Sequence, residues 1–136
     1  MAVIETKLLS RNKSGEYIGV ITLNKEKSLN ALDLEMVQSM TASLAQWRDD
    51  DSVVAVFIDA SGHKAFCAGG DVVSLYQSMK LIRTEQQLKG KLKLEHPPQF
   101  FTDFFTQEYS LDYCIHTYPK PIITWGSGIV MGGGLG

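Results

Sequence analysis

Apolar and polar positions alternate in the first part of the chain. Residues 3–9 alternate between two faces and predict a strand, although neither face is cleanly apolar. Residues 17–23 are mostly β-branched and aromatic, which predicts a second strand. Turn-forming residues occupy positions 12–15 between them, so we expect a hairpin, followed by a polar loop over residues 24–30.

After this loop, apolar residues recur at steps of three and four, which predicts a helix with one buried stripe. We expect Asp33 to be its N-cap. Asp49, Asp50 and Asp51 are expected in the exit loop, because acidic side chains are unfavourable at a helix C-terminus. The residues of the predicted stripe are Leu34, Val37, Met40, Leu44 and Trp47.

Two later stretches are largely apolar without helical spacing. Residues 53–58 are all apolar, which is typical of a strand buried on both faces of a sheet covered by helices. Residues 122–130 predict another strand of this kind. The alternation of strands and helices predicts an α/β fold in one domain.

The segment between these strands is more varied. Residues 72–79 predict a short helix, and residues 80–99, polar and basic with a Pro-Pro pair, predict a mobile surface excursion that acts as a lid. Residues 100–118 return to helical spacing. Their aromatic and aliphatic side chains are too many for one narrow stripe, so we expect this helix to be buried on more than one side.

Composition excludes several classes of function. The chain of 136 residues is 44% apolar and 21% charged, with a formal net charge of −2. No overall basic field argues for nucleic acid, and no apolar run is long enough to span a bilayer. The first residues lack the pattern of a secretory signal, so a cytoplasmic location is expected.

Familiar cofactor and metal motifs do not fit this sequence. Cys67 and Cys114 show no metal-ligand spacing and are expected to be reduced, structural thiols. Residues 132–136 do not match the Gly-x-Gly-x-x-Gly of dinucleotide sites. His63, His96 and His116 are isolated, and we expect surface or loop positions for them.

The candidate chemistry lies in two glycine-rich turns, residues 64–71 and Gly132-Gly133-Gly134, which each follow an apolar run. Glycines at such turns leave amide N–H groups free to point at an oxygen, and two turns together can make an oxyanion hole. Glu108 lies among aromatic residues, where it is either desolvated with a raised pKa or exposed on a polar side. Composition favours exposure. Asp71 either caps the following helix or contacts a ligand.

Several motifs, in this order, resemble those of the crotonase (enoyl-CoA hydratase/isomerase) superfamily. They are Asn30-Ala31-Leu32, Ala65-Phe66-Cys67-Ala68-Gly69-Gly70-Asp71, Pro119-Lys120-Pro121-Ile122-Ile123 and Gly128-Ile129-Val130-Met131-Gly132-Gly133-Gly134. Phe104-Phe105-Thr106-Gln107-Glu108-Tyr109 and Met131 to Gly136 are most similar to the 3-hydroxyisobutyryl-CoA hydrolase branch. The resemblance runs from about Tyr17 to the last residue.

The resemblance implies a crotonase-like spiral of ββα turns and an acyl-CoA substrate, whose coenzyme A is part of the substrate and not a separate cofactor. It implies that the amides of Ala68 and Gly133 polarise the thioester carbonyl and that Glu108 contacts the substrate. The segments that it places on the coenzyme A side contain Asn30, Ala31, Ala68, Gly69, Gly70 and Asp71.

One position departs from the hydratases of the superfamily, which carry a catalytic glutamate two residues after the glycine triplet, where this chain has Gly136. The resemblance therefore favours thioester hydrolysis in valine breakdown. The hydrolase branch uses a Glu and an Asp from a later stretch, so the rest of the domain is expected after Gly136 and this chain by itself is expected to be inactive. An enoyl-CoA hydratase or isomerase and a catalytically silent acyl-CoA-binding fragment stay open as alternatives, as does a homo-oligomer.

Overall fold

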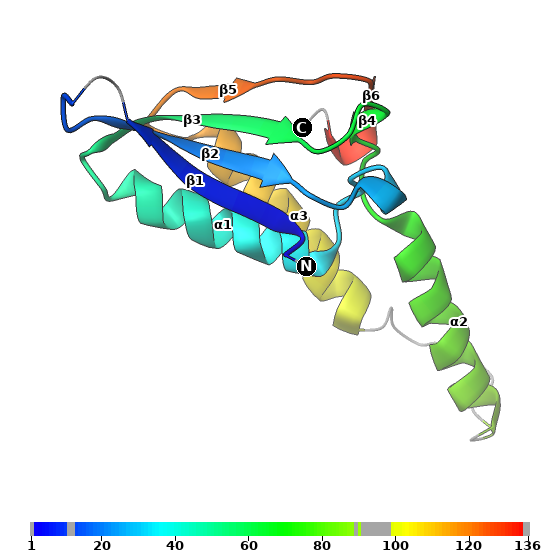
Figure 1. Ribbon diagram of the computed structural model, residues 1–136. Coiled ribbons are helices and arrows are strands. Elements are labelled where there is room, and N and C mark those ends of the chain that lie inside the picture. The colour runs from blue at the N-terminus through cyan, green and yellow to red at the C-terminus, as the bar shows by residue number, and fades with distance from the viewer. Residues whose placement is uncertain (1, 11–12, 89, 91–98, 135–136) are drawn as a thin grey trace.

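A computed structural model describes residues 2–10, 13–88, 90 and 99–134. Among these residues the main sheet has four strands in the order β1-β2-β3-β5, and helices lie along one of its faces (Figure 1). The strands are β1 (Ile4–Ser10), β2 (Tyr17–Leu23), β3 (Val53–Ala60) and β5 (Ile122–Thr124). The α/β expectation is confirmed.

The predicted hairpin of the first two strands is confirmed. β1 and β2 form the antiparallel hairpin, with Ile4 opposite Leu23 and Ser10 opposite Tyr17. β2 pairs with β3 in parallel, and β3 pairs with β5 in parallel. Parallel neighbours need long crossovers, and α1 (Leu34–Arg48) supplies the crossover between β2 and β3.

Both ends of α1 are held by side chains. The Met36 amide donates to Oδ1 of Asp33 at 2.8 Å, which confirms Asp33 as the N-cap. At the other end, Nζ of Lys120 donates to the carbonyl oxygens of Trp47 and Asp50. The Trp47 carbonyl belongs to the last turn of α1, whose carbonyls lack partners within the helix, and Asp50 follows the C-cap, so Lys120 fixes the chain before β5 to the end of α1.

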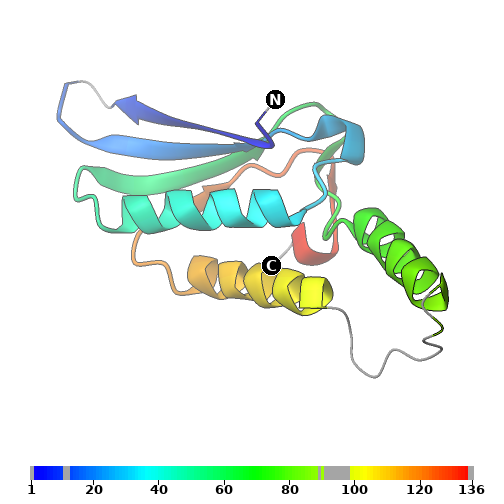
Figure 2. The ribbon, with the colours of Figure 1, turned by 90° about the horizontal axis from the view of Figure 1, so that it is seen from below.

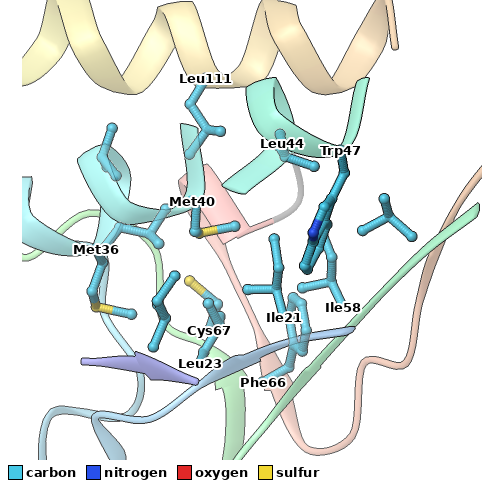
Figure 3. Packing of buried hydrophobic residues seen from close by; sticks show 14 of the residues in the cluster. Ile21, Leu23, Met36, Met40, Leu44, Trp47, Ile58, Phe66, Cys67 and Leu111 are labelled. Carbon is cyan, nitrogen blue, oxygen red and sulfur yellow. The ribbon is translucent and has the colours of Figure 1, made fainter. Parts of the chain in front are cut away.

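The core lies between the sheet and the helices α1 and α3 (Gln99–His116). Figure 3 shows Leu111 of α3 and Met40, Leu44 and Trp47 of α1 above Ile21 and other sheet residues. Four of the five predicted stripe residues of α1 are buried; Leu34 is half-buried, and Met36 joins the stripe. Burying each side chain of this size contributes about 1.5–3 kcal/mol.

Only one face of β3 is well buried, so the predicted burial of this strand on both faces is wrong. Val53, Val56 and Ile58 are buried, whereas Val54 is 41% exposed and Phe57 half-buried. Helices α1 and α3 lie on the same side of the sheet (Figure 2). A short apolar run therefore does not distinguish a strand that is buried on both faces of the sheet from a strand that is buried on one face.

The two later helices also differ from expectation. α2 (Val72–Leu88) continues past residue 79, so the first part of the predicted surface excursion is helical. Residues 91–98 of that excursion lie outside the described residues. In α3, Phe104, Glu108 and Leu111 are buried, while Phe105, Tyr109 and Tyr113 are exposed. The expectation that α3 is buried on more than one side is therefore wrong.

The predicted strand over residues 122–130 is broken into two. β5 ends at Thr124, and β6 (Ile129–Val130) joins β4 (Ala65–Cys67) in a separate small parallel sheet. Gly128, with a φ of 78°, lies in the turn between them. Across the described ranges, we find no helix with the length and apolar character needed to span a membrane.

Candidate active site

The two glycine-rich turns meet at the ends of β4 and β6. Cys67 is opposite Val130 in the small sheet, and the Met131 amide donates to the Cys67 carbonyl at 3.1 Å. A methyl group on Gly69 would lie only 3.1 Å from the Met131 oxygen and 3.4 Å from the Gly133 nitrogen, and Gly69 has a φ of +95°. The predicted meeting of the two turns is confirmed, and it requires glycine at position 69.

Glu108 reaches these turns from α3. Its side chain is buried, with 6% of the residue exposed, so the exposed alternative was wrong. A methyl group on Gly133 would lie 2.5 Å from Oε1 of Glu108, and one on Gly70 would lie 3.5 Å from the same atom. Glu108 shares its face of α3 with Phe104 and Leu111, at steps of four and three, and this spacing is the sequence signal for its burial.

The environment of Glu108 disfavours its charged form. Burial raises the pKa of Glu108, and the negative charge of Asp112 raises it further. Burial also raises the pKa of Asp112. Sequence reasoning missed Asp112, although its position one turn after Glu108 places the two carboxyl groups on the same face of α3. The site thus holds two neighbouring carboxyl groups whose pKa values are both raised.

A cavity of about 330 Å³ opens between the turns and α3. It combines an apolar wall with the carboxyl groups of Glu108 and Asp112, which is the usual composition of a small-molecule site. Its lining includes Ala68, Gly69, Gly70, Gly132 and Gly133 from the turns, and Leu75, Phe104, Phe105, Tyr109 and Met131 from the apolar wall.

The two amides that the resemblance implies as oxyanion donors differ in their partners. The Gly133 amide has no backbone acceptor among the described residues. The Ala68 amide donates to the Leu29 carbonyl at 3.1 Å. A ligand oxygen would therefore have to share the amide hydrogen with Leu29 or replace Leu29 as its acceptor. The pairing of Ala68 with Gly133 as donors stays a prediction.

Asp71 is the last residue of the first turn and caps α2. Its Oδ1 accepts from the Ser74 amide at 3.1 Å, and its Oδ2 accepts from the Ser74 hydroxyl at 2.8 Å and from Nζ of Lys25 at 3.2 Å. Burial would raise the pKa of Asp71, but the hydrogen bonds from Ser74 and Lys25 outweigh it and lower the pKa. The capping role is confirmed, whereas contact with a substrate stays a prediction.

Asn30 supports the loop before α1 with all of its side-chain polar atoms. Its Nδ2 donates to the carbonyls of Ser61 at 3.1 Å and Ala65 at 3.0 Å, and its Oδ1 accepts from the Lys25 amide at 2.8 Å. The residue is 1% exposed. Its side chain is therefore committed to the fold, and contact with a substrate stays a prediction for Asn30.

A second cavity, of about 640 Å³, lies on the other side of the first turn. It shares Ala68, Gly70 and Val72 with the first cavity, so the two are neighbours across this turn. Ala31 and Asp71, both predicted to contact the substrate, are in its lining. Lys25 and Lys27 also line this cavity. Lys25 is paired with Asp33 and Asp71, whereas no ion pair of Lys27 is found in the described part of the chain, so Lys27 supplies the positive charge of the cavity.

The remaining polar candidates do not gather at the site. Neither His63 nor His116 lines the two cavities, and His96 lies outside the described residues. Burial raises the pKa of the Cys67 thiol, as expected for a structural cysteine. In the described part of the chain, no group of His, Cys, Asp and Glu side chains is arranged to hold a metal ion.

Known proteins are similar to this chain in both sequence and fold. The 3-hydroxyisobutyryl-CoA hydrolase, mitochondrial, of Danio rerio is 39% identical over 118 residues, which are 87% of this chain and 27% of the relative. Probable 3-hydroxyisobutyryl-CoA hydrolase 3 of Arabidopsis thaliana is 36% identical over 97% of this chain and 30% of the relative. The chain thus spans less than a third of the length of these curated relatives.

A solved structure supports the same relationship. The crystal structure of an enoyl-CoA hydratase from Rhodobacter sphaeroides 2.4.1 matches with a TM-score of 0.70 and 35% identity, over 96% of this chain and 33% of that one. The crotonase fold is therefore present but incomplete here. A family model described as enoyl-CoA hydratase/isomerase matches residues 18–136. This chain belongs to the enoyl-CoA hydratase/isomerase family.

Proposed function

We propose that this chain supplies the thioester-binding part of an acyl-CoA hydrolase that acts on 3-hydroxyisobutyryl-CoA. The observation that carries the proposal is the buried carboxyl group of Glu108, which lies against both glycine-rich turns at the wall of a cavity. Support also comes from the curated relatives, which are named as hydrolases of this thioester.

The two neighbouring cavities suit the two ends of an acyl-CoA. The larger cavity carries Lys27, whose positive charge suits the phosphate groups of coenzyme A, while the neighbouring Lys25 is paired with Asp33 and Asp71. The smaller cavity has apolar walls and Glu108, which suit a short acyl group with a hydroxyl. The turn that contains Ala68 and Gly70 lies between them, where the thioester would pass.

The proposed reaction is hydrolysis. Water adds to the thioester carbonyl, the carbonyl oxygen becomes an oxyanion, and the C–S bond then breaks to give a carboxylic acid and the thiol of coenzyme A. Amides at Ala68 and Gly133 would donate to the oxyanion, and removing one such donor costs about 2.7–4 kcal/mol of barrier. Glu108 would orient the acyl hydroxyl or the attacking water.

Hydration of an enoyl-CoA is the second candidate, favoured by the solved structure at 35% identity, which is described as an enoyl-CoA hydratase. Against it stands Gly136, two residues after the glycine triplet. Glycine has no side chain that could carry or accept the proton that hydration requires. We therefore rank hydrolysis first.

Binding can be tested on the 136-residue chain by calorimetry with 3-hydroxyisobutyryl-CoA and with free coenzyme A. The proposal predicts that both bind, and that only the thioester loses affinity in Glu108→Gln, because Glu108 lines the acyl cavity. No detectable binding of the thioester would contradict it. Binding without turnover in a protein that also carries the rest of the fold would favour the silent acyl-CoA-binding alternative.

A further inference from the structure

Lys25 connects two carboxylates that are far apart in sequence. Its Nζ lies 2.6 Å from Oδ2 of Asp33 and 3.2 Å from Oδ2 of Asp71. Burial would lower the pKa of Lys25, but its hydrogen bonds to both carboxylates outweigh this effect and raise the pKa. The ammonium group is therefore charged and shared between two anions.

Each of these carboxylates begins a helix. Asp33 caps α1 through the Met36 amide, and Asp71 caps α2 through the Ser74 amide. One ammonium group thus connects the starts of two helices. Asp71 is also the residue that directly follows Ala68-Gly69-Gly70, so Lys25 holds the end of the first glycine-rich turn.

The loop that carries Lys25 also forms backbone hydrogen bonds with the same turn. The Leu29 carbonyl accepts from the Ala68 amide, the Leu32 amide donates to the Gly69 carbonyl at 2.7 Å, and the Asp71 amide donates to the Leu32 carbonyl at 2.8 Å. Leu29 and Asn30 both have positive φ, 53° and 52°. Such left-handed conformations are costly outside glycine and persist where surrounding contacts enforce them.

We propose that Lys25 is a positioning residue for the turn of residues 68–71, which it fixes by bridging Asp33 and Asp71. The predicted effect of Lys25 on catalysis rests on the proposed function, whereas its predicted effect on the structure of the turn is independent of that function. The turn carries the Ala68 amide and the Gly70 backbone that faces Glu108, so a shift of this turn changes the donors offered to a thioester oxygen.

Lys27 provides a matched control. It lines the same cavity as Lys25 and has the same charge, but no ion pair involving it occurs among the residues that the structure describes. If Lys25 served only to attract the phosphates of coenzyme A, replacing either lysine would have the same consequence. A positioning role predicts different consequences, which separate the two explanations.

Hydrogen exchange of the unliganded 136-residue chain tests the positioning role without any ligand. Lys25→Met should raise the exchange rates of the Ala68, Asp71 and Ser74 amides by about three- to tenfold, while strands β2 and β3 keep their protection. Lys25→Arg should restore protection, because a guanidinium group can bridge two carboxylates. Lys27→Met should leave these amides unchanged.

A second variant keeps the test decisive if Lys25→Met destabilises the whole chain. Asp71→Asn weakens the bridge from its other end but retains a good capping residue, and it should also speed exchange at Ala68 and Asp71. Wild-type rates in Asp71→Asn, or equal rates in Lys25→Met and Lys27→Met, would overturn the proposal.

Kinetics then separate positioning from ligand attraction. In a protein that carries this segment with the rest of the fold, Lys25→Met should lower kcat about tenfold or more with little change in KM for the thioester. Lys27→Met should raise KM instead. An effect of Lys25→Met on KM alone, together with unchanged exchange at the turn, would assign Lys25 to ligand binding and overturn the positioning role.

Discussion

Gly133 and Glu108 lie so close that no side chain fits between them, since a methyl group on Gly133 would fall 2.5 Å from Oε1 of Glu108. Real carbon–oxygen contacts do not reach this distance, so one of the two groups would have to move. The contact joins the second glycine-rich turn to α3 and holds the carboxyl group at the wall of the cavity. The position of Glu108 therefore depends on glycine at position 133.

Gly133→Ala should displace the carboxyl group of Glu108, which is the mobile end of its side chain, so the stability cost should stay below about 1 kcal/mol while the affinity for 3-hydroxyisobutyryl-CoA falls. Gly70→Ala is the matched control, because its methyl group would meet Glu108 at 3.5 Å, an ordinary contact. Calorimetry with 3-hydroxyisobutyryl-CoA measures the affinity of both variants, and urea unfolding measures their stability. Equal thioester affinity of the two variants would show that Glu108 does not lie against Gly133 as described.

Glu108 should make stability depend on pH. Its pKa is raised in the folded chain, first by burial and then by Asp112, so the folded state holds this proton more tightly than the unfolded state. Below the ordinary carboxyl pKa, Glu108 is protonated in both the folded and the unfolded state, and its titration does not lower the stability of the folded state. As pH rises from that value through the raised pKa, the folded state loses stability relative to the unfolded state.

Glu108→Gln removes this titration. The variant should therefore gain stability relative to the wild type as pH rises through that window, and the difference should level off above it. Unfolding of both proteins in urea from pH about 3.5 to about 8 measures this, a range that spans ordinary carboxyl titration and a raised pKa. A stability difference that is constant over the whole range would contradict the desolvated state of Glu108.

Leu111 should anchor α3 to the core. The residue is 1% exposed and belongs to the cluster shared with α1 and the sheet (Figure 3). Leu111→Ala should cost about 2–5 kcal/mol of unfolding free energy, whereas a surface change is usually within about 0.5 kcal/mol. Tyr113→Ala, at a position 70% exposed on the same helix, is the control. A similar cost for both would place the buried face of α3 elsewhere.

The cap of α1 gives a simpler prediction. Asp33→Ala removes the acceptor of the Met36 amide and one of the two partners of Lys25, so it should cost about 1 kcal/mol or somewhat more. Asp33→Asn retains the cap but weakens the ion pair, and should cost less. Thermal unfolding followed by circular dichroism ranks the two. An Asp33→Asn variant as unstable as Asp33→Ala would mean that the charge, and not the cap, matters.

Local signals in the sequence predicted much of the fold. β-branched residues marked Tyr17–Leu23, and the cap at Asp33 followed from its place before the helical spacing. The second half of α2 was not predicted, because the polarity of residues 80–88 suggested a surface loop. Most of these residues are nevertheless good helix formers. The break between β5 and β6 was not predicted, because residues 122–130 form one largely apolar run, although Gly126 and Gly128 interrupt it.

The site could be predicted only in part. Glycine turns after apolar runs predicted the meeting of the two turns, since parallel strands bring their ends together. Sequence could not show that the Ala68 amide faces the Leu29 carbonyl, because this depends on the left-handed conformation of Leu29. The bridge from Lys25 to Asp71 was also missed, because it joins residues 46 positions apart that only the tertiary fold brings together.

The most direct test of the proposed function compares two thioesters in a protein that carries this segment together with the rest of the fold. Release of free coenzyme A thiol from 3-hydroxyisobutyryl-CoA and hydration of crotonyl-CoA are measured under the same conditions. We predict a higher kcat/KM for hydrolysis of 3-hydroxyisobutyryl-CoA than for hydration of crotonyl-CoA. Faster hydration of crotonyl-CoA, with little release of thiol, would contradict it.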